Sequence, residues 1–425
     1  MKKFVALLLA LTLCIGLCAC GAQPEAPAAT EAPAATDAPA EETPAATSET
    51  ETTTASKDIK VGFIFLHDEN STYDLNFINA AKAACAEVGL SDDQVMMKTN
   101  ISESQACYDA AAELVDAGCD LIITDSFGHE SFALAAAKEF PEVHFVSCTG
   151  VKAHTEGLRN FHNAFASIYE GRYLAGVAAG LKLNEMIENG DITAEEAKMG
   201  YVGAFPYAEV KSGYTSFFLG ARSVCPSVTM EVTFTSSWYD EALEKEAANK
   251  LINNGCVLIS QHADSMGAPT ACETAGVPNV SYNGSTVAAC PNTFIVSSRI
   301  DWTPFFVYAI NCVASGEDIG YDWTGTLATG SVVLTDVNEQ AAAAGTAEKI
   351  AEVMKALEDG SVKVFDTATF TVNGETVTTY LADVDDLGDY VGETEAISDG
   401  VFLESFYRSA PYFDLDIDGI TNLDA

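Results

Sequence analysis

The sequence predicts an α/β protein made of two doubly wound parallel-sheet lobes. Strand-like apolar runs alternate with Ala-rich amphipathic stretches from Ile59 onward, and the same alternation starts again after Glu170. Strands and helices that alternate at this spacing indicate parallel sheets covered by helices on both faces. The roughly 370 residues from Asp58 onward are too many for one hydrophobic core and suit two lobes.

Each predicted element rests on its own pattern. The first half has predicted strands at Ile59–Leu66, Val95–Ile101, Asp120–Asp125 and Val143–Cys148, separated by predicted helices at Tyr73–Val88, Glu103–Ala117 and Glu130–Phe140. The second half runs in the order helix Glu170–Leu183, strand Met199–Ala204, helix Val210–Val224, strand Val228–Thr235, helix Asp240–Asn254, strand Val257–Gln261, helix Ser265–Ala275 and strand Asn279–Tyr282. Ligands of open α/β sheets bind beyond the carboxyl ends of the strands, so two such lobes face to face predict a closable cleft.

The first twenty residues indicate export and lipid attachment. Lys2 and Lys3 precede an apolar run, Phe4–Gly16, that is shorter than the about 20 residues needed to span a bilayer. The run leads into Leu17-Cys18-Ala19-Cys20, a lipobox in which Cys20 would take diacylglycerol. We expect residues 1–19 to be a cleaved lipoprotein signal peptide, and the mature protein to be lipid-anchored on the extracytoplasmic face of the cell membrane. The alternative is an ordinary signal peptide with an incidental Cys20.

Residues 20–57 predict a disordered tether. They are rich in Ala, Pro, Thr and Glu and contain no aromatic residue, so they cannot bury enough apolar surface to offset the entropy of ordering. The formal net charge of the whole chain is −41. Nucleic acid is therefore excluded as a partner, and so is membrane binding other than through the lipid, because both require a positive surface.

The sequence offers no pattern typical of catalysis or metal binding. His129-Glu130 lacks the second His of a zinc motif, and no Gly-x-Ser-x-Gly elbow is present. Nine of the 12 cysteines follow the tether, an odd number without a Cys-x-x-Cys pair, so we expect buried free thiols. We therefore expect no catalytic residues, no metal and no cofactor.

Five stretches of the chain carry a family resemblance. They are Thr124–Gly128, Tyr169–Gly176, Ser237–Ala248, Gln261–Ser265 and Asp301-Trp302. In this order, over roughly residues 60–316, they resemble the basic membrane protein (BMP) family of ABC-transporter substrate-binding lipoproteins. That family has a type I periplasmic-binding-protein fold and is associated with purine nucleosides and nucleobases.

The resemblance implies three chain crossings between the lobes. Lobe one would hold residues 58–161 and 297–318, and lobe two residues 162–296 and 319–425. The hinges would lie near His162–Ala164, Val296–Arg299 and Gly316–Thr324. The resemblance fades beyond Gly330, and the chain from Phe365 onward is assigned to lobe two only by continuity.

Residues at strand ends are the candidates for ligand contact, since purine recognition needs aromatic faces for stacking and fixed polar groups for the ring edge. The candidate ligand-binding residues are Asp68, Tyr73, Ser126, Phe127, Phe205, Trp238, His262, Asp264, Asn283, Asp301 and Trp302. Asp301 and Trp302 enter through the resemblance alone. The alternative for Phe127 and Trp238 is a core aromatic that caps a sheet, and for His262 a structural histidine.

Two departures from the family pattern concern the ligand. Relatives carry a Trp in the loop after the first strand, where this chain has Ser71. Relatives that bind nucleosides can hold the ribose with an Asp, where this chain has Asn283. A neutral side chain holds hydroxyl groups less strongly than a carboxylate, which slightly favours a free nucleobase over a nucleoside.

The expected function is that of an extracytoplasmic substrate-binding lipoprotein of an ABC importer. It would act as a monomer, capture a purine nucleobase or nucleoside in the cleft between its lobes, and present it to the permease and ATPase subunits. The alternatives are a receptor of the same fold for riboflavin or a sugar, a ligand sensor for a membrane kinase, and an extracytoplasmic enzyme.

Overall fold

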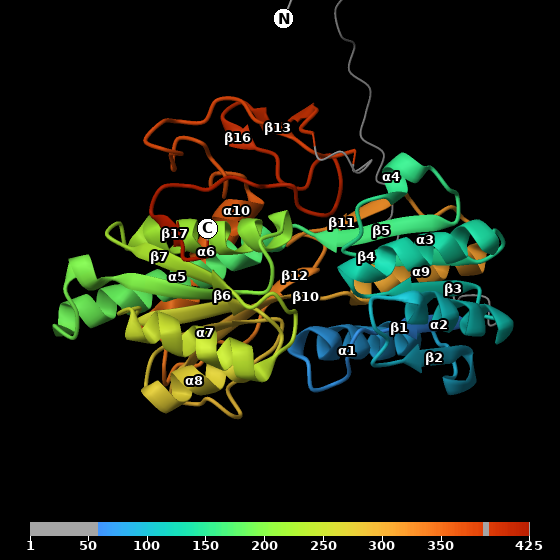
Figure 1. The fold of residues 1–425 in the computed structure, drawn as a ribbon, viewed down its shortest axis with the longest axis horizontal. Helices are drawn as coiled ribbons and strands as arrows, with labels where there is room; N and C mark the ends of the chain where they lie inside the picture. The colour runs from blue at the N-terminus through green and yellow to red at the C-terminus, as the bar shows by residue number, and fades with distance from the viewer. Residues whose placement is uncertain (1–57, 386–390, 425) are drawn as a thin grey trace, which may run out of the picture. The chain divides into compact units, whose positions relative to one another are not determined.

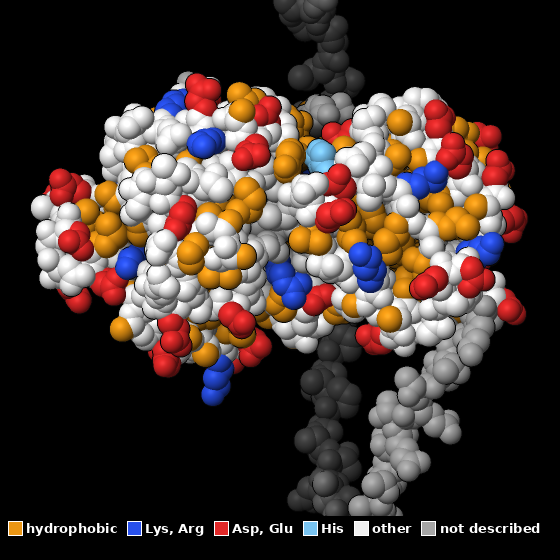
Figure 2. Space-filling model, turned by 90° about the horizontal axis from the view of Figure 1, so that it is seen from below, with side chains coloured by type: hydrophobic (Ala, Val, Ile, Leu, Met, Phe, Trp, Pro, Cys, Tyr) orange, Lys and Arg blue, Asp and Glu red, His pale blue; other side chains and the backbone are white. Residues whose placement is uncertain are grey.

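The structure, a computed structural model, describes residues 58–385 and 391–424 (Figure 1). The expected signal peptide, Cys20 and the expected tether lie outside these residues. No helix in the described ranges combines the length and the apolar character that crossing a bilayer requires. Acidic side chains are spread over the face drawn in Figure 2 rather than gathered in one patch.

The first lobe is built around a parallel sheet that has six strands in the described residues, in the order β11-β5-β4-β3-β1-β2. Its strands are β1 (Val61–Ile64), β2 (Val95–Lys98), β3 (Leu121–Thr124), β4 (His144–Cys148), β5 (Phe161–Ala166) and β11 (Asp322–Gly325). Its helices are α1 (Thr72–Glu87), α2 (Gln105–Asp116), α3 (Glu130–Glu139), α4 (Ala153–Glu156) and α9 (Thr303–Ser315). The strand β3 is buried along its whole length, as expected for a parallel strand covered on both faces.

The second lobe surrounds a sheet that has seven strands in the described part of the chain, in the order β12-β10-β9-β8-β6-β7-β17. Its strands are β6 (Lys198–Gly203), β7 (Thr229–Phe234), β8 (Leu258–His262), β9 (Asn279–Tyr282), β10 (Phe294–Ile300), β12 (Val332–Leu334) and β17 (Ile420–Asn422). Its helices are α5 (Ile168–Asn189), α6 (Ala208–Val224), α7 (Glu241–Asn253), α8 (Gly267–Ala275) and α10 (Thr346–Glu358). The edge strand β12 runs antiparallel to β10, whereas the other pairs are parallel.

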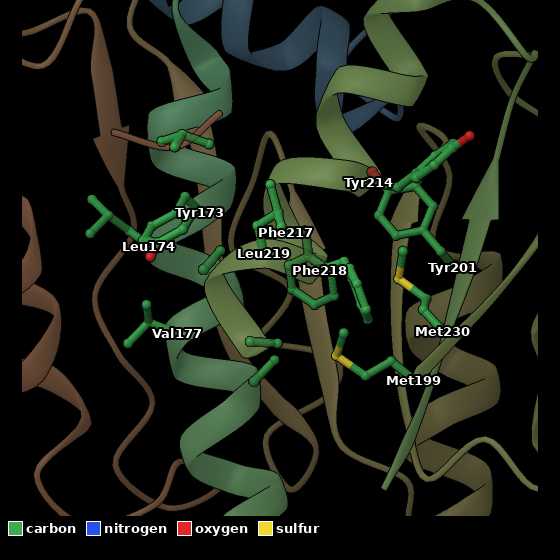
Figure 3. Close-up of a cluster of buried hydrophobic side chains, with 14 of the residues drawn as sticks. Tyr173, Leu174, Val177, Met199, Tyr201, Tyr214, Phe217, Phe218, Leu219 and Met230 are labelled. Carbon is green, nitrogen blue, oxygen red and sulfur yellow. The ribbon is translucent and has the colours of Figure 1, made fainter. Parts of the chain in front are cut away.

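The core of the second lobe depends on the close approach of α5 and α6 (Figure 3). A Cβ atom at Gly176 would lie 2.0 Å from the carbonyl oxygen of Phe217, and one at Gly220 would lie 2.0 Å from that of Tyr173. Neither contact is possible, so only glycine allows the two helices to pack at this distance. The glycine that ends the stretch Tyr169–Gly176 therefore serves helix packing.

The predicted fold class is confirmed, and every predicted strand and helix overlaps an observed one. The largest difference within the predicted set is at α5, which continues past the predicted end at Leu183 and stops at Asn189. Gly190 then adopts a φ of 78°, the left-handed conformation typical of a helix end. The cysteine prediction is also confirmed, because the nine cysteines of the described ranges are free and buried.

The pairing of the strands puts the chain crossings between the lobes at residues that differ from the expected ones. The strand β5 extends to Ala166 and pairs with β4 in the first sheet, beyond the expected boundary at residue 161. The strand β11 also belongs to the first sheet, although residues 319–425 were expected in lobe two. Because β10 stays in the second sheet as far as Ile300, strand membership puts the crossings after Ala166, Ile300 and Gly325. The division into lobes on this basis is a proposal.

The C-terminal segment, defined here as residues 365–385 and 391–424, forms short strands and packs against the second lobe. Its strands are β13 (Leu381–Ala382), β14 (Thr394–Glu395), β15 (Ile397–Ser398), β16 (Val401–Phe402) and, at its end, β17, which pairs with β7. Phe365 stacks on Phe413 with ring centroids 4.4 Å apart, and Phe402 meets Phe413 edge-on. These rings belong to the same buried cluster as α5 and α6, so the segment is an integral part of the lobe.

Candidate ligand-binding cleft

Two cavities lie where the carboxyl ends of strands from both sheets face each other. The inner cavity has a volume of about 20 Å³ and the outer cavity about 450 Å³. The inner cavity is lined by Leu66, Tyr73, Ser126, Phe127 and Thr149 of the first lobe and by Glu209, Trp238, His262 and Asp264 of the second. Phe127, Thr149 and Glu209 line both cavities, so the two adjoin. This is the position at which open α/β sheets bind ligands.

Six of the predicted ligand-binding residues are brought together at the inner cavity: Tyr73, Ser126, Phe127, Trp238, His262 and Asp264. Tyr73 lies in the first turn of α1, which begins after Ser71 because the Ser71 hydroxyl accepts a hydrogen bond from the Asp74 amide. The Tyr73 hydroxyl donates to the carbonyl oxygen of Asp125 over 2.7 Å. Because the hydroxyl proton of Tyr73 is used in this hydrogen bond, the ring of Tyr73, and not its hydroxyl proton, is available to a ligand in the inner cavity.

Asp264 is the polar centre of the inner cavity. No described residue donates a hydrogen bond to its carboxyl group, although the residue is only 5% exposed. Burial raises the pKa of Asp264 well above its usual range, and the negative charges of Asp74 and Glu244 raise it further. A protonated carboxyl group can both donate and accept a hydrogen bond, so Asp264 is suited to a neutral ligand that does the same.

The main chain of Asp264 joins the two lobes. Its carbonyl oxygen accepts a hydrogen bond from the Thr72 amide over 3.0 Å and one from the Thr72 hydroxyl over 3.2 Å. Nearby, the rings of His67 and Tyr239 approach to 5.4 Å between centroids. These contacts between the lobes identify the closed form of the cleft.

Glu244 holds the loop that carries Asp264. Both of its carboxylate oxygens accept from the Ser265 amide at 3.2 Å, and one also accepts from the Asp240 amide at 3.1 Å. The side chain is fully buried, and this burial raises the pKa of Glu244 to about 7. Since the pKa is higher in the folded than in the unfolded protein, protonated Glu244 favours folding at low pH, and this contribution is lost as the pH rises through about 7.

We expect the substitution Glu244→Gln to flatten the pH dependence of stability. Between pH 5 and pH 8 the free energy of unfolding of the wild type should fall by up to about 3 kcal/mol more than that of the variant, because glutamine stays neutral. Urea denaturation at a series of pH values measures this difference. Glu241→Gln, on the exposed side of the same helix, is the matched control and should keep the wild-type slope. Equal slopes for Glu244→Gln and wild type would contradict a raised pKa.

Aromatic rings from both lobes meet at the cavities. Phe127 of the first lobe lies 5.7 Å from Tyr207 of the second, measured between ring centroids, and the two side chains are 38% and 44% exposed. Phe205 stacks on Tyr207 and meets Trp238 edge-on, each at 5.1 Å. Phe205 was predicted to contact the ligand but lines neither cavity. It packs against Tyr207 and Trp238, which do line them. A planar ligand entering here meets aromatic faces on both sides of the cleft.

His262 is a buried, neutral wall of the inner cavity. Its Nε2 atom lies 3.4 Å from a carboxylate oxygen of Glu209, and its ring centroid lies 4.6 Å from that of Tyr282. Burial lowers the pKa of His262 despite the nearby Glu209. Its Nδ1 atom has no hydrogen-bond partner among the described residues. The His262 ring therefore packs against Tyr282, and its Nδ1 atom forms no hydrogen bond with the described residues.

Trp302 and Asp301 do not lie at the inner cavity, contrary to the expectation drawn from the resemblance. Trp302 is 1% exposed and stacks on Phe77 with centroids 4.4 Å apart, in the core between α1 and α9. Asp301 accepts a hydrogen bond over 3.0 Å from the amide of Thr303, the first residue of α9, and lies 3.4 Å from Arg299. The motif Asp301-Trp302 marks the start of a helix rather than a ligand contact.

Asp68 and Asn283 also lie outside the inner lining. The Asp68 carboxylate accepts hydrogen bonds from the backbone and side chain of Asn70 and from the side chain of Asn100, so it shapes the loop between β1 and α1. Asn283 follows β9 in a turn with a φ of 66°, and its amide donates to the carbonyl oxygen of Ser298. The Asp68 side chain thus arranges its loop, whereas Asn283 is held through its backbone amide, and its side-chain Nδ2 atom is buried without a hydrogen-bond partner among the described residues.

Thr149 and Glu209 line both cavities and were not predicted. Thr149 directly follows β4, so the strand-end rule that selected Phe127 would have found it. It has a φ of 66°, a conformation that a β-branched residue rarely adopts, and such backbone strain is concentrated at functional sites. Glu209 lies in the first turn of α6 and is marked in the sequence only by the preceding Phe205-Pro206-Tyr207.

A family model described as "ABC transporter substrate-binding protein PnrA-like" matches residues 64–364. This chain belongs to that family. Membership makes it an ABC transporter substrate-binding protein of the PnrA-like (BMP) family, which implies a small-molecule ligand, transporter partners and an extracytoplasmic location. The resemblance found in the sequence is confirmed.

Known proteins similar to this PnrA-like chain carry different ligand names. A purine-binding protein of Brucella abortus is 31% identical over 62% of this chain and 71% of its own length. A putative ABC transporter glucose-binding protein of Haloferax volcanii is 31% identical over 55% of this chain, and the match spans 56% of that relative's length. Among solved structures, an ABC transporter solute-binding protein from Aeropyrum pernix K1 has a TM-score of 0.61 at 17% identity, covering 75% of this chain and 94% of that one. It shows the same fold.

Proposed function

We propose that this PnrA-like protein captures a purine nucleobase or nucleoside in the cleft and presents it to the permease of an ABC importer. The observation that carries the proposal is the Asp264 carboxyl group, which is buried without a protein hydrogen-bond donor among the described residues and lines the inner cavity together with Trp238 and Phe127 from opposite lobes. We propose ligand contact for the six predicted residues that line the inner cavity.

The chemistry of a purine matches these groups. Its flat ring can stack on the aromatic side chains, which is worth about 1–3 kcal/mol per base. Its edge carries N–H donors beside ring-nitrogen acceptors, and a protonated carboxyl group pairs with both. The name of the Brucella relative supports a purine, and the name of the Haloferax relative supports a sugar as the second candidate.

Ligand entry requires the lobes to open. The inner cavity of about 20 Å³ is far below the about 300–1,000 Å³ typical of small-molecule sites, and the Thr72–Asp264 hydrogen bonds close it. Only the closed form contacts a ligand from both lobes, so a ligand should shift the equilibrium toward closure.

We expect adenine, guanine, hypoxanthine or their nucleosides to bind the purified protein, and to be recovered chemically unchanged. At a hundredfold excess over Kd, binding should stabilise the fold by about 2.7 kcal/mol, which is measurable as a rise in Tm. Calorimetry with the same compounds gives the affinities. Riboflavin and glucose are the competing candidates. Binding of glucose or riboflavin with no response to any purine would overturn the purine assignment, and turnover of a bound compound would indicate an enzyme.

We also propose that Cys20 anchors the protein to the membrane through lipid, as the lipobox predicts. The substitution Cys20→Ala should abolish lipid attachment, because no other residue of the lipobox provides a thiol at the acceptor position. Incorporation of labelled fatty acid into the expressed protein measures it, with Cys18→Ala as the control that keeps the acceptor. Labelling of the Cys20→Ala variant at its N-terminus would rule out this anchor.

A further inference from the structure

The C-terminal segment lies at the cleft as well as on the second lobe. More than half of the described residues that line the outer cavity belong to it, among them Leu381, Asp383 and Arg408. In Figure 1 the segment, at the red end of the colour scale, covers one side of the second lobe and extends toward β11 of the first. The family match ends at residue 364, before the segment begins. The segment is therefore a wall of the cleft that the family model does not include.

The attachment of the segment to the second lobe is extensive and largely apolar. Phe365, Phe402 and Phe413 belong to the buried cluster that also holds α5 and α6, and β17 pairs with β7. In addition, Lys211 Nζ lies 2.8 Å from a carboxylate oxygen of Asp414. Separating the segment from this lobe would expose buried aromatic surface to water, which is unfavourable. The segment must therefore move together with the second lobe.

The attachment of the segment to the first lobe is of a different kind. Neither of the two buried clusters around the first sheet contains a residue of the segment in the described ranges. Instead, the Ser409 amide donates a hydrogen bond to the Asp322 carboxylate over 2.8 Å. The Nε2 atom of His154 donates to the carbonyl oxygen of Val384 over 3.0 Å. Both hydrogen bonds can break without exposing a hydrophobic core.

The two hydrogen bonds lie where opening of the cleft would strain them. His154 is in α4, which follows the carboxyl end of β4, the edge of the sheet that faces the cleft. Its Nδ1 atom lies 3.8 Å from a carboxylate oxygen of Asp322 in β11, so the two residues form one attachment point. The Val384 carbonyl oxygen also accepts from Arg408 within the segment, over 3.3 Å. If the lobes separate, α4 moves away from a carbonyl group that stays with the second lobe.

We propose that the C-terminal segment is a strap, which the second lobe carries and which His154 and Asp322 of the first lobe fasten in the closed form. Opening the cleft then breaks the hydrogen bonds of the strap as well as those between Thr72 and Asp264. The strap lowers the population of the open form before a ligand is present. It acts in the same way whatever the ligand is, so it does not rest on the purine assignment.

Hydrogen exchange at the Thr72 amide measures opening in the ligand-free, full-length protein. Thr72 is the first residue of α1, where the helix provides no acceptor, and its amide donates to the Asp264 carbonyl oxygen of the other lobe. This amide therefore loses its protection when the cleft opens. We expect His154→Ala and Asp322→Ala each to raise the exchange rate of Thr72 by about two- to tenfold, the effect of losing one hydrogen bond.

Glu156→Ala and Asp318→Ala are the matched controls. Glu156 lies in α4 and pairs with Lys138, and Asp318 pairs with Arg159 shortly before β11, so each substitution removes an ion pair within the first lobe. Both controls should exchange at Thr72 as the wild type does. The amides of the buried strand β3 report unfolding of the whole lobe, and their exchange should be unchanged in all four variants.

Two results would overturn the strap. The first is an unchanged exchange rate at Thr72 in both His154→Ala and Asp322→Ala, even with faster exchange at Ser409, because the contacts would then only order the segment. The second is an equal rise at Thr72 and in β3, which would indicate a general loss of stability. Since no ligand is used, either result leaves the proposed function standing, and a failure to bind purines leaves the strap standing.

Discussion

Replacing Trp302 by alanine should lower the free energy of unfolding by about 3–5 kcal/mol, the usual cost of removing a large aromatic side chain from a core. The ring is 1% exposed and packs between Phe77 and Phe306, with centroids 4.4 and 6.2 Å away. The surrounding helices α1 and α9 cannot collapse fully into the space that the ring leaves. Denaturation in urea, monitored by circular dichroism, measures the effect.

Trp238→Ala is the matched control, because Trp238 is partly exposed and lines the inner cavity. It should cost little stability and should weaken purine binding by about 1–3 kcal/mol. Trp302→Ala, studied at a temperature at which it remains folded, should bind purines as the wild type does. The reverse pattern, with affinity lost at Trp302 and kept at Trp238, would restore the ligand contact that the family resemblance implied.

The substitution Asp264→Ala should weaken purine binding by about 1–3 kcal/mol, because it leaves the edge of a buried base without its hydrogen-bond partner. Calorimetry measures the change. The hydrogen bonds between the lobes are unaffected, since they use the main-chain carbonyl oxygen of Asp264. Asp68→Ala, in a loop outside the lining, should leave affinity unchanged.

The protonation of Asp264 is tested by a second substitution, Asp264→Asn. Asparagine is neutral and carries both a donor and an acceptor, as the protonated carboxyl group does. If burial keeps Asp264 protonated, Asp264→Asn should retain much more affinity than Asp264→Ala, and binding by the wild type should weaken at high pH. Equal losses in both variants would show that the ligand needs a carboxylate.

The fold could be predicted because its sheets are parallel and buried. Parallel strands covered on both faces are nearly continuous apolar runs, as in β3, and the Ala-rich amphipathic stretches between them predicted the helices, although the end of α5 before Gly190 was missed. The same regularity led to the candidate site, since strand ends selected Phe127 and Asp264, which both line the inner cavity. The crossings were misplaced because strand pairing, which no local pattern encodes, decides to which sheet β5 and β11 belong.

Other parts of the site required the structure. Trp302 was misassigned because a motif shared with a family does not tell whether its side chain points to the core or to the cleft. The C-terminal segment has strands of two or three residues, too short for a periodic pattern, and it is ordered by packing Phe365 and Phe413 against the second lobe. Its role as a wall of the outer cavity follows only from tertiary contacts.

The Thr72–Asp264 hydrogen bonds have a consequence for the speed of ligand capture. They join main-chain or short side-chain groups that are present whether or not a ligand is bound, so the closed form has contacts of its own. A ligand can then enter only at the rate at which these contacts break. The observed association rate should consequently level off at high ligand concentration, at the opening rate of the lobes, instead of rising in proportion to concentration.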